Sequence, residues 1–250
     1  MMAVWSLVLL VLLFFMTSVV GVVTGSNSLV TVPVMFQFGI DEKVAVATNM
    51  FGLTFMAIGA TIPFVRQGSI EFKKLTPLVI LTIIGSAIGA LLVGVITNQS
   101  IKLIVTVAMI AMVLFTLIGP NRTTQGEPRE THVSSIAYVM TFVLAIYGGL
   151  YSGGYVTVLT ATFVAFASMN FARAVAATKF VNVFSSGIAT LIFMWQGLVD
   201  YRLGIILAIS MFAGAFVGAH YATKMNEVWL RRIFVTTVFI LAIKMLFDFS

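Results

Sequence analysis

The sequence predicts an all-α integral membrane protein made of two inverted repeats. This rests on an apolar composition, on long apolar segments, and on motifs that recur in the same order in both halves. Of the 250 residues, 60% are hydrophobic and only 9% are charged, whereas about a quarter of the residues of a soluble domain are charged. The composition therefore excludes a soluble enzyme, a DNA-binding domain and a secreted disulfide scaffold.

Residue counts exclude further classes of site. The chain has no Cys and two His, so neither a disulfide framework nor a thiolate site is expected. Two separated His cannot form a metal site without carboxylates, and neither a metal nor a cofactor is expected. The net charge of +6 is explained by loop Lys and Arg that orient helices in a bilayer, not by a nucleic-acid partner. The N-terminus lacks a basic region and is interpreted as part of the mature protein.

Ten apolar segments follow one another along the chain. They are expected near 3–21, 28–39, 44–65, 75–97, 101–119, 134–150, 155–169, 174–195, 203–223 and 229–248. A polar stretch at 120–132 is expected to be a cytoplasmic linker between a first transmembrane repeat, 1–119, and a second, 133–250. The lipid bilayer is thus the main partner, and a homo-oligomer is left open.

The two halves share four motifs, which indicates a duplication. The matched pairs are 66–72 with 195–201, Gly85 and Gly89 with Gly214 and Gly218, 46–48 with 176–178, and Gly21 and Gly25 with Gly149 and Gly153. Paired halves are frequent in transporters. Gly85 with Gly89, and Gly214 with Gly218, are pairs of small residues four positions apart (small-xxx-small pairs). These pairs are expected to serve helix packing.

Loop charges indicate how the halves are oriented. If each half crossed the membrane four times, with the glycine-broken segment counted as one crossing, the twelve loop Lys and Arg residues would divide six against six and give no orientation. If each glycine-broken stretch is a re-entrant hairpin followed by three transmembrane helices, they divide nine against three. Arg66, Lys73, Lys74, Arg122, Arg129, Arg173, Lys224, Arg231 and Arg232 then lie inside, opposite Lys43, Lys102 and Arg202. The positive-inside rule favours this arrangement, with both termini extracytoplasmic and the halves inverted.

The glycine-containing breaks at 21–28 and 148–155 are candidate substrate sites. Glycine allows the unusual dihedrals of a break, and the second limb of each hairpin begins there, so that its positive dipole end suits an anion. Ser26, Asn27 and Ser28 are residue types that cap a following helix. The alternative is that the glycines only permit tight packing. The candidate residues are Gly25, Ser26, Asn27, Ser28, Gly153, Gly154 and Tyr155.

Lys179 is the most informative single residue, because a charged side chain within a transmembrane segment indicates function. Thr178 adjoins it, Asn182 lies one turn further on, and the first half has Thr48 and Asn49 at the matching place. The alternative is a lysine that extends to the inner interface. No apolar segment has a carboxylate near its middle, which argues against a proton or Na⁺ relay.

The repeated breaks, the 176–186 stretch AATKFVNVFSS and the 197–201 stretch GLVDY resemble the TauE/SafE sulfite exporter family. The resemblance covers nearly the whole chain. It implies outward transport of a small organosulfur anion, such as sulfite or sulfoacetate, across a bacterial inner membrane, by a protein that is not an enzyme. The family often has a proline after each break; Pro33 fits, but the second half has Ala161. Transport or import of another organic anion, and a non-transporting membrane scaffold, are the alternatives.

Overall fold

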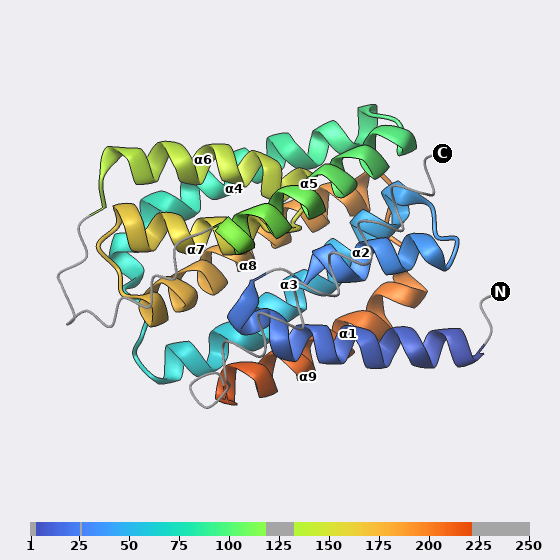
Figure 1. Ribbon diagram of the computed structural model, residues 1–250, viewed down its shortest axis with the longest axis horizontal. Coiled ribbons are helices and arrows are strands. Elements are labelled where there is room, and N and C mark those ends of the chain that lie inside the picture. The colour runs from blue at the N-terminus through green and yellow to red at the C-terminus, as the bar shows by residue number, and fades with distance from the viewer. Residues whose placement is uncertain (1–3, 26, 119–132, 222–250) are drawn as a thin grey trace.

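The structure is a computed structural model that describes residues 4–25, 27–118 and 133–221. These residues form nine helices and no strand, which confirms the all-helical fold (Figure 1). The helices are α1 (Val4–Thr24), α2 (Ser28–Gln37), α3 (Glu42–Arg66), α4 (Phe72–Val95), α5 (Asn98–Ile118), α6 (Ser135–Leu150), α7 (Tyr155–Phe166), α8 (Phe171–Trp195) and α9 (Tyr201–Tyr221). The expected linker at 120–132, the tenth segment at 229–248 and Ser26 lie outside the described residues.

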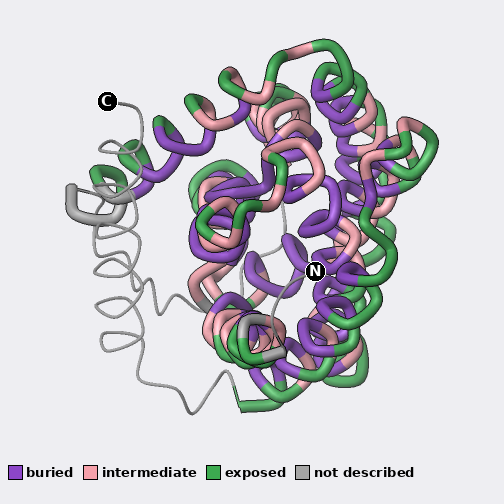
Figure 2. The backbone as a smooth tube through the Cα atoms, turned by 90° about the vertical axis from the view of Figure 1, so that its right-hand side faces the viewer, coloured by how far each residue is buried: buried purple, intermediate pink, exposed green. Residues whose placement is uncertain are grey.

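Four of these helices are long and apolar enough to cross a membrane: α3, α4, α8 and α9. Their outward faces carry large apolar side chains, and Figure 2 shows exposed residues on the outside of the bundle. On α4, for example, Ile80, Ile84 and Ile88 are 53%, 49% and 40% exposed and recur once per turn. Such a stripe fits lipid, not water.

The shared loop motif has the same local structure in both halves. The helices α3 and α8 end at Arg66 and Trp195, and the glycines two residues later, Gly68 and Gly197, have φ of 68° and 69°. The following amide then bonds back to the helix, from Ser69 to the Phe64 carbonyl at 3.1 Å and from Leu198 to the Phe193 carbonyl at 3.0 Å. This is the glycine-dependent helix ending that the Gln-Gly pair encodes in each half.

The middle of the bundle is formed by α3 and α8, which pack against each other. In addition α9 packs on α3 and α4 on α8, while α1 covers α9 and α6 covers α4. The small-xxx-small pairs lie at these outer contacts. A Cβ atom on Gly89 would collide with the Ile146 carbonyl of α6, and one on Gly218 would collide with Val19 of α1. Their predicted role in packing is confirmed.

Contacts between helix ends show which segments meet at each end of the bundle. At one end of the bundle Asn98 donates to Asp41, and the Lys43 ammonium donates to the Gly94 carbonyl at 3.1 Å. At the other end the Arg173 guanidinium lies 3.3 Å from the Glu71 carboxylate.

The first limb of each hairpin runs parallel to a helix of the other half. Ser210 of α9 bonds to Val11 of α1, and Gly214 lies against Phe15. Similarly, Gly85 and Gly89 of α4 lie against Phe142 and Ile146 of α6. Since α9 and α4 run in opposite directions, so do α1 and α6 (Figure 1). This arrangement suits inverted halves; the inverted repeat across a membrane and its boundaries stay a prediction.

Candidate functional site

The two helix breaks touch each other in the interior of the bundle. The Thr157 hydroxyl at the start of α7 donates to the Thr24 carbonyl at the end of α1, at 2.7 Å. The Tyr151 hydroxyl donates to the Ser28 carbonyl at 2.9 Å. The beginnings of α2 and α7, which come from opposite halves of the chain, therefore lie side by side. Two positive helix ends that meet in an apolar surrounding favour an anion between them.

Left-handed glycines make the breaks possible. Gly25 has φ of 78° and Gly154 has φ of 82°, a region that residues with a side chain rarely adopt. At Gly25 a Cβ atom would also lie 2.9 Å from the Thr157 hydroxyl and 3.0 Å from its amide nitrogen. Gly153 in turn lies against the Tyr151 ring. Gly25 therefore serves both the turn and the close approach of the two breaks, whereas Gly154 serves the turn.

Lys179 extends from α8 to the first break. Its side chain is only 3% exposed, and its ammonium donates to the Gly21 carbonyl at 2.9 Å. A lysine that extends to the inner interface would expose its ammonium, so that alternative does not fit the structure. A primary ammonium has three donors, and only this one bond is found among the described residues. The remaining donors make Lys179 the positive centre of the candidate site.

Three of the predicted polar residues hold helices together. The Asn49 amide donates to the Ser28 hydroxyl at 2.9 Å and accepts from that of Thr31 at 2.7 Å, which joins α3 to α2. The hydroxyl of Thr48 accepts the Asp200 amide at 3.0 Å, at the start of α9. Thr178 pairs with Thr160 of α7 at 3.0 Å. Direct contact of Thr48, Asn49 and Thr178 with a substrate stays a prediction.

The capping role expected for Asn27 is wrong. Its backbone is helical, with φ of −50° and ψ of −49°, and its side chain makes no cap bond. The amide donates instead to the Ser18 hydroxyl of α1 at 2.8 Å. An N-cap residue needs an extended backbone to turn its side chain over the helix start, which Asn27 lacks. Ser28 is the first residue of α2, and Gly154 precedes α7 without a side chain to cap it.

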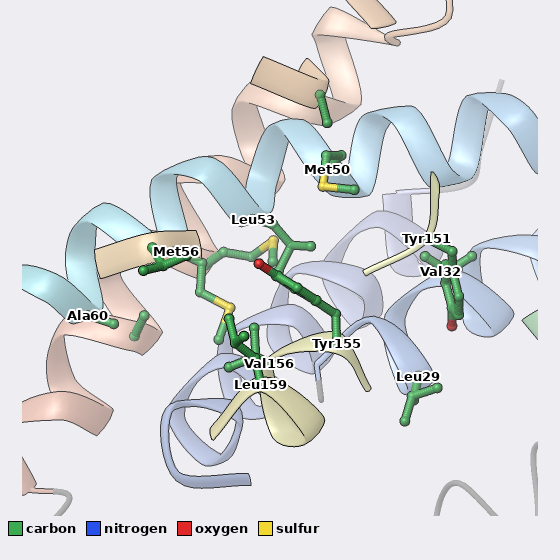
Figure 3. Close-up of a cluster of buried hydrophobic side chains, with 14 of the residues drawn as sticks. Leu29, Val32, Met50, Leu53, Met56, Ala60, Tyr151, Tyr155, Val156 and Leu159 are labelled. Atoms are coloured by element: carbon green, nitrogen blue, oxygen red, sulfur yellow. The ribbon is translucent and has the colours of Figure 1, made fainter. Parts of the chain in front are cut away.

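Tyr155 and Asn182 complete the predicted set. Tyr155 is fully buried, and Figure 3 shows its ring extending toward Leu53 and Met56 of α3. A Cβ atom on Gly148 would lie 2.8 Å from this ring, so a glycine is needed there. Asn182 is 5% exposed, one turn beyond Lys179 on α8. The side-chain amide of Asn182 makes no hydrogen bond among the described residues, so this group is available to a ligand.

Several contact residues escaped the sequence analysis, among them Ser18, Tyr151 and Thr157. Ser18 could have been found, because it is a polar residue within an otherwise apolar segment. The Gly21 carbonyl that accepts from Lys179 could not have been found, since the two residues are 158 positions apart.

The long apolar helices define a multi-pass helical membrane protein, and the comparisons with known proteins place it among membrane transporters. The chain belongs to the TauE/SafE sulfite exporter family, whose family model matches residues 10–245. It is 27% identical to the "Probable membrane transporter protein ORF9" of a Sinorhizobium species, over 94% of this chain and 90% of that protein. It is 25% identical to the "Probable membrane transporter protein YfcA" of Escherichia coli K12, over 96% and 90%. It is also 23% identical to a "Probable membrane transporter protein" of Haemophilus influenzae, over 96% and 95%. No solved structure shows a significant match to the chain.

Proposed function

We propose that this protein exports sulfite, or a related small organosulfur anion such as a sulfonate, from a bacterial cytoplasm across the inner membrane. The observation that carries the proposal is the buried Lys179 ammonium at the meeting point of the two breaks. A charge within a membrane protein is costly unless it is paired, and the described residues give Lys179 a neutral carbonyl as its partner. A small oxyanion would supply the missing negative charge.

The surroundings of Lys179 favour an oxyanion over other ligands. The starts of α2 and α7 offer positive dipole ends to several oxygens at once, and Asn182 adds an amide with no partner among the described residues. The Lys179 ammonium and the two helix starts favour negative charge, and the NH2 group of Asn182 can donate to an anion. The family description names sulfite, and the relatives' names describe membrane transporters, which supports transport and not catalysis. The lining residues of the proposed site are Lys179, Asn182 and the two breaks.

Flux into liposomes tests this function. Purified protein in liposomes should carry labelled sulfite and sulfoacetate faster than acetate or lactate at equal concentration. Empty liposomes give the background. Transport of the carboxylates without the sulfur anions would contradict the proposed substrate class, and the absence of flux of every anion would contradict transport.

A further inference from the structure

A cavity lies where the C-terminal ends of α4 and α8 meet. It has a volume of about 330 Å³ and is lined by Gly94, Trp195, Gln196 and Leu198. The helix α4 ends at Val95 and α8 ends at Trp195, and the two helices pack on each other. Cavities that bind small molecules start at about 300 Å³, so this one has room for a compact ligand group. It is separate from the Lys179 site, because its residues lie at the opposite end of α8.

The rim of the cavity is apolar and exposed. Val95, next to Gly94, and Trp195 are 80% and 79% exposed, and an exposed Trp at the end of a transmembrane helix is typical of the bilayer interface. About one turn earlier in each helix, Leu91 and Leu191 are also exposed. Apolar surface therefore continues from the cavity along both helices, which suits a ligand that has a polar head and apolar chains.

The cavity offers a partial negative charge and an unpartnered acceptor. The C-terminal end of a helix is negative, and two such ends meet here. The side-chain NH2 group of Gln196 lies 3.5 Å from the carbonyls of Ala90 and Leu91, at the limit of a hydrogen bond. The oxygen of the same amide is buried and has no partner among the described residues, which costs free energy. A rotation of this loosely held amide can turn its oxygen to a donor in the cavity, such as a ligand ammonium.

A cation already lies at one of the two helix ends. The Lys43 ammonium, from the first turn of α3, donates to the Gly94 carbonyl at 3.1 Å. An ammonium has three donors, and no other bond of this group is found among the described residues. The nearby Asp41 carboxylate is engaged by amides at the start of α3 and by Asn98. The remaining donors of Lys43 therefore suit a phosphate beside the cavity.

We propose that this cavity, here called the headgroup cavity, binds the headgroup of phosphatidylethanolamine. The ammonium of the lipid donates to the Gln196 amide oxygen, its phosphate accepts from Lys43, and its acyl chains lie along the exposed apolar side chains of α4 and α8. Phosphatidylcholine has no N–H group to donate, and phosphatidylglycerol has no positive charge for the two helix ends. The bound lipid joins α3, α4 and α8 at one end of the bundle, whichever anion the protein transports.

Lipid-dependent melting tests the headgroup cavity. Phosphatidylethanolamine added to the purified protein in detergent should raise the melting temperature more than phosphatidylcholine or phosphatidylglycerol with the same acyl chains. In Gln196→Leu the concentration of phosphatidylethanolamine that gives half of the effect should rise about tenfold or more, because a hydrogen bond to a charged group is lost. Without added lipid this variant should melt at the same or a higher temperature, since an unpartnered acceptor is removed.

Two further variants locate the lipid. Lys43→Gln removes the positive partner of the phosphate and should also raise the concentration needed for half of the effect. Gln67→Leu is the matched control, because Gln67 follows α3 as Gln196 follows α8 and is exposed. Its response to phosphatidylethanolamine should equal that of the unaltered protein.

Two outcomes would overturn the headgroup cavity. Equal stabilisation by the three lipids, or by none of them, would mean that the protein does not recognise an ammonium headgroup. An unchanged response in both Gln196→Leu and Lys43→Gln would place the bound lipid elsewhere. Mass spectrometry of the intact, unaltered protein with an equal mixture of the three lipids gives the headgroup preference even if Gln196→Leu does not fold, and Lys43→Gln then locates the lipid.

Discussion

Lys179 differs from the other Lys and Arg residues of the described chain because it alone is buried. Its place in α8 follows from the sequence, but its direction toward the first break does not. The long side chain carries a charge across the interface between the halves, from α8 to the carbonyl of Gly21.

Lys179→Met should abolish most anion flux and leave the folded protein intact. Methionine fills a similar volume, and replacement of a buried charge by an apolar side chain is often neutral or stabilising. The melting temperature of the purified protein should therefore hold or rise, while the KM for sulfite flux rises or flux disappears. Lys73→Met is the matched control, since it removes the same charge at an exposed position on α4.

Lys179→Arg should restore flux in part, because a planar guanidinium is not a compact ammonium. Unaltered flux in Lys179→Met would show that the buried charge has no role in anion binding.

The helix break is the element on which the site depends. Both breaks were expected from their glycines, and both exist, with left-handed residues at Gly25 and Gly154. The side chains that hydrogen-bond to the backbone at each break are not apparent from the sequence. The second half uses the Tyr151 and Thr157 side chains to bond the backbone of the first, whereas the expected capping by Asn27 is missing.

Gly25→Ala should destabilise the protein. A left-handed backbone costs a residue with a side chain about 1–2 kcal/mol, and the added methyl group would press on the Thr157 backbone. The melting temperature should fall, and anion flux with it, because the breaks would separate.

Gly187→Ala is the matched control for Gly25→Ala. Gly187 lies within α8 with no atom within 4 Å of a built Cβ, and alanine favours a helix over glycine by about 1 kcal/mol. This variant should melt at the same or a higher temperature. An equal loss in both variants would show that the break itself is not the sensitive point.

At the scale of the whole molecule the two ends differ in charge. Arg66, Lys73, Lys74 and Arg173 lie at the end where Glu71 meets Arg173, while Lys43, Lys102 and Arg202 lie at the opposite end. The α1–α2 and α6–α7 hairpins return to the end at which they start, and this sets the division. These described residues divide four against three, and the sequence places five further Lys and Arg residues on the Glu71 side, which gives nine against three. The positive-inside rule then predicts a cytoplasmic Glu71 end.

Single cysteines in this Cys-free chain should report that orientation. Gln99→Cys at the start of α5 should react with an impermeant thiol reagent in intact cells. Gln67→Cys after α3 should react only once the membrane is opened. Both positions are exposed in the structure. The reverse labelling would place the Lys43 end in the cytoplasm, and labelling of both would contradict the membrane crossing of the intervening helix α4.

Export should be electrogenic and need no coupling ion. A monovalent anion that leaves a cell with a negative interior gains about 2.3 kcal/mol per 100 mV, and no apolar segment of the sequence has a carboxylate near its middle to bind Na⁺ or a proton. Sulfite flux in liposomes should follow a potential set by K⁺ and valinomycin, with equal Na⁺ and pH on both sides. Flux that ignores this potential but follows a Na⁺ or proton gradient would contradict the mechanism.

The sequence by itself determined the membrane class, the helices and both breaks, because hydropathy and glycine conformation are local properties that act within a few residues. It also singled out Lys179, since a charge in an apolar segment stands out without its surroundings. The tertiary structure decided which groups meet: Lys179 with Gly21, Thr157 with Thr24, and Asn49 with Thr31 within the first half. Such pairings depend on how segments far apart in the chain pack, and no local pattern of residues specifies that.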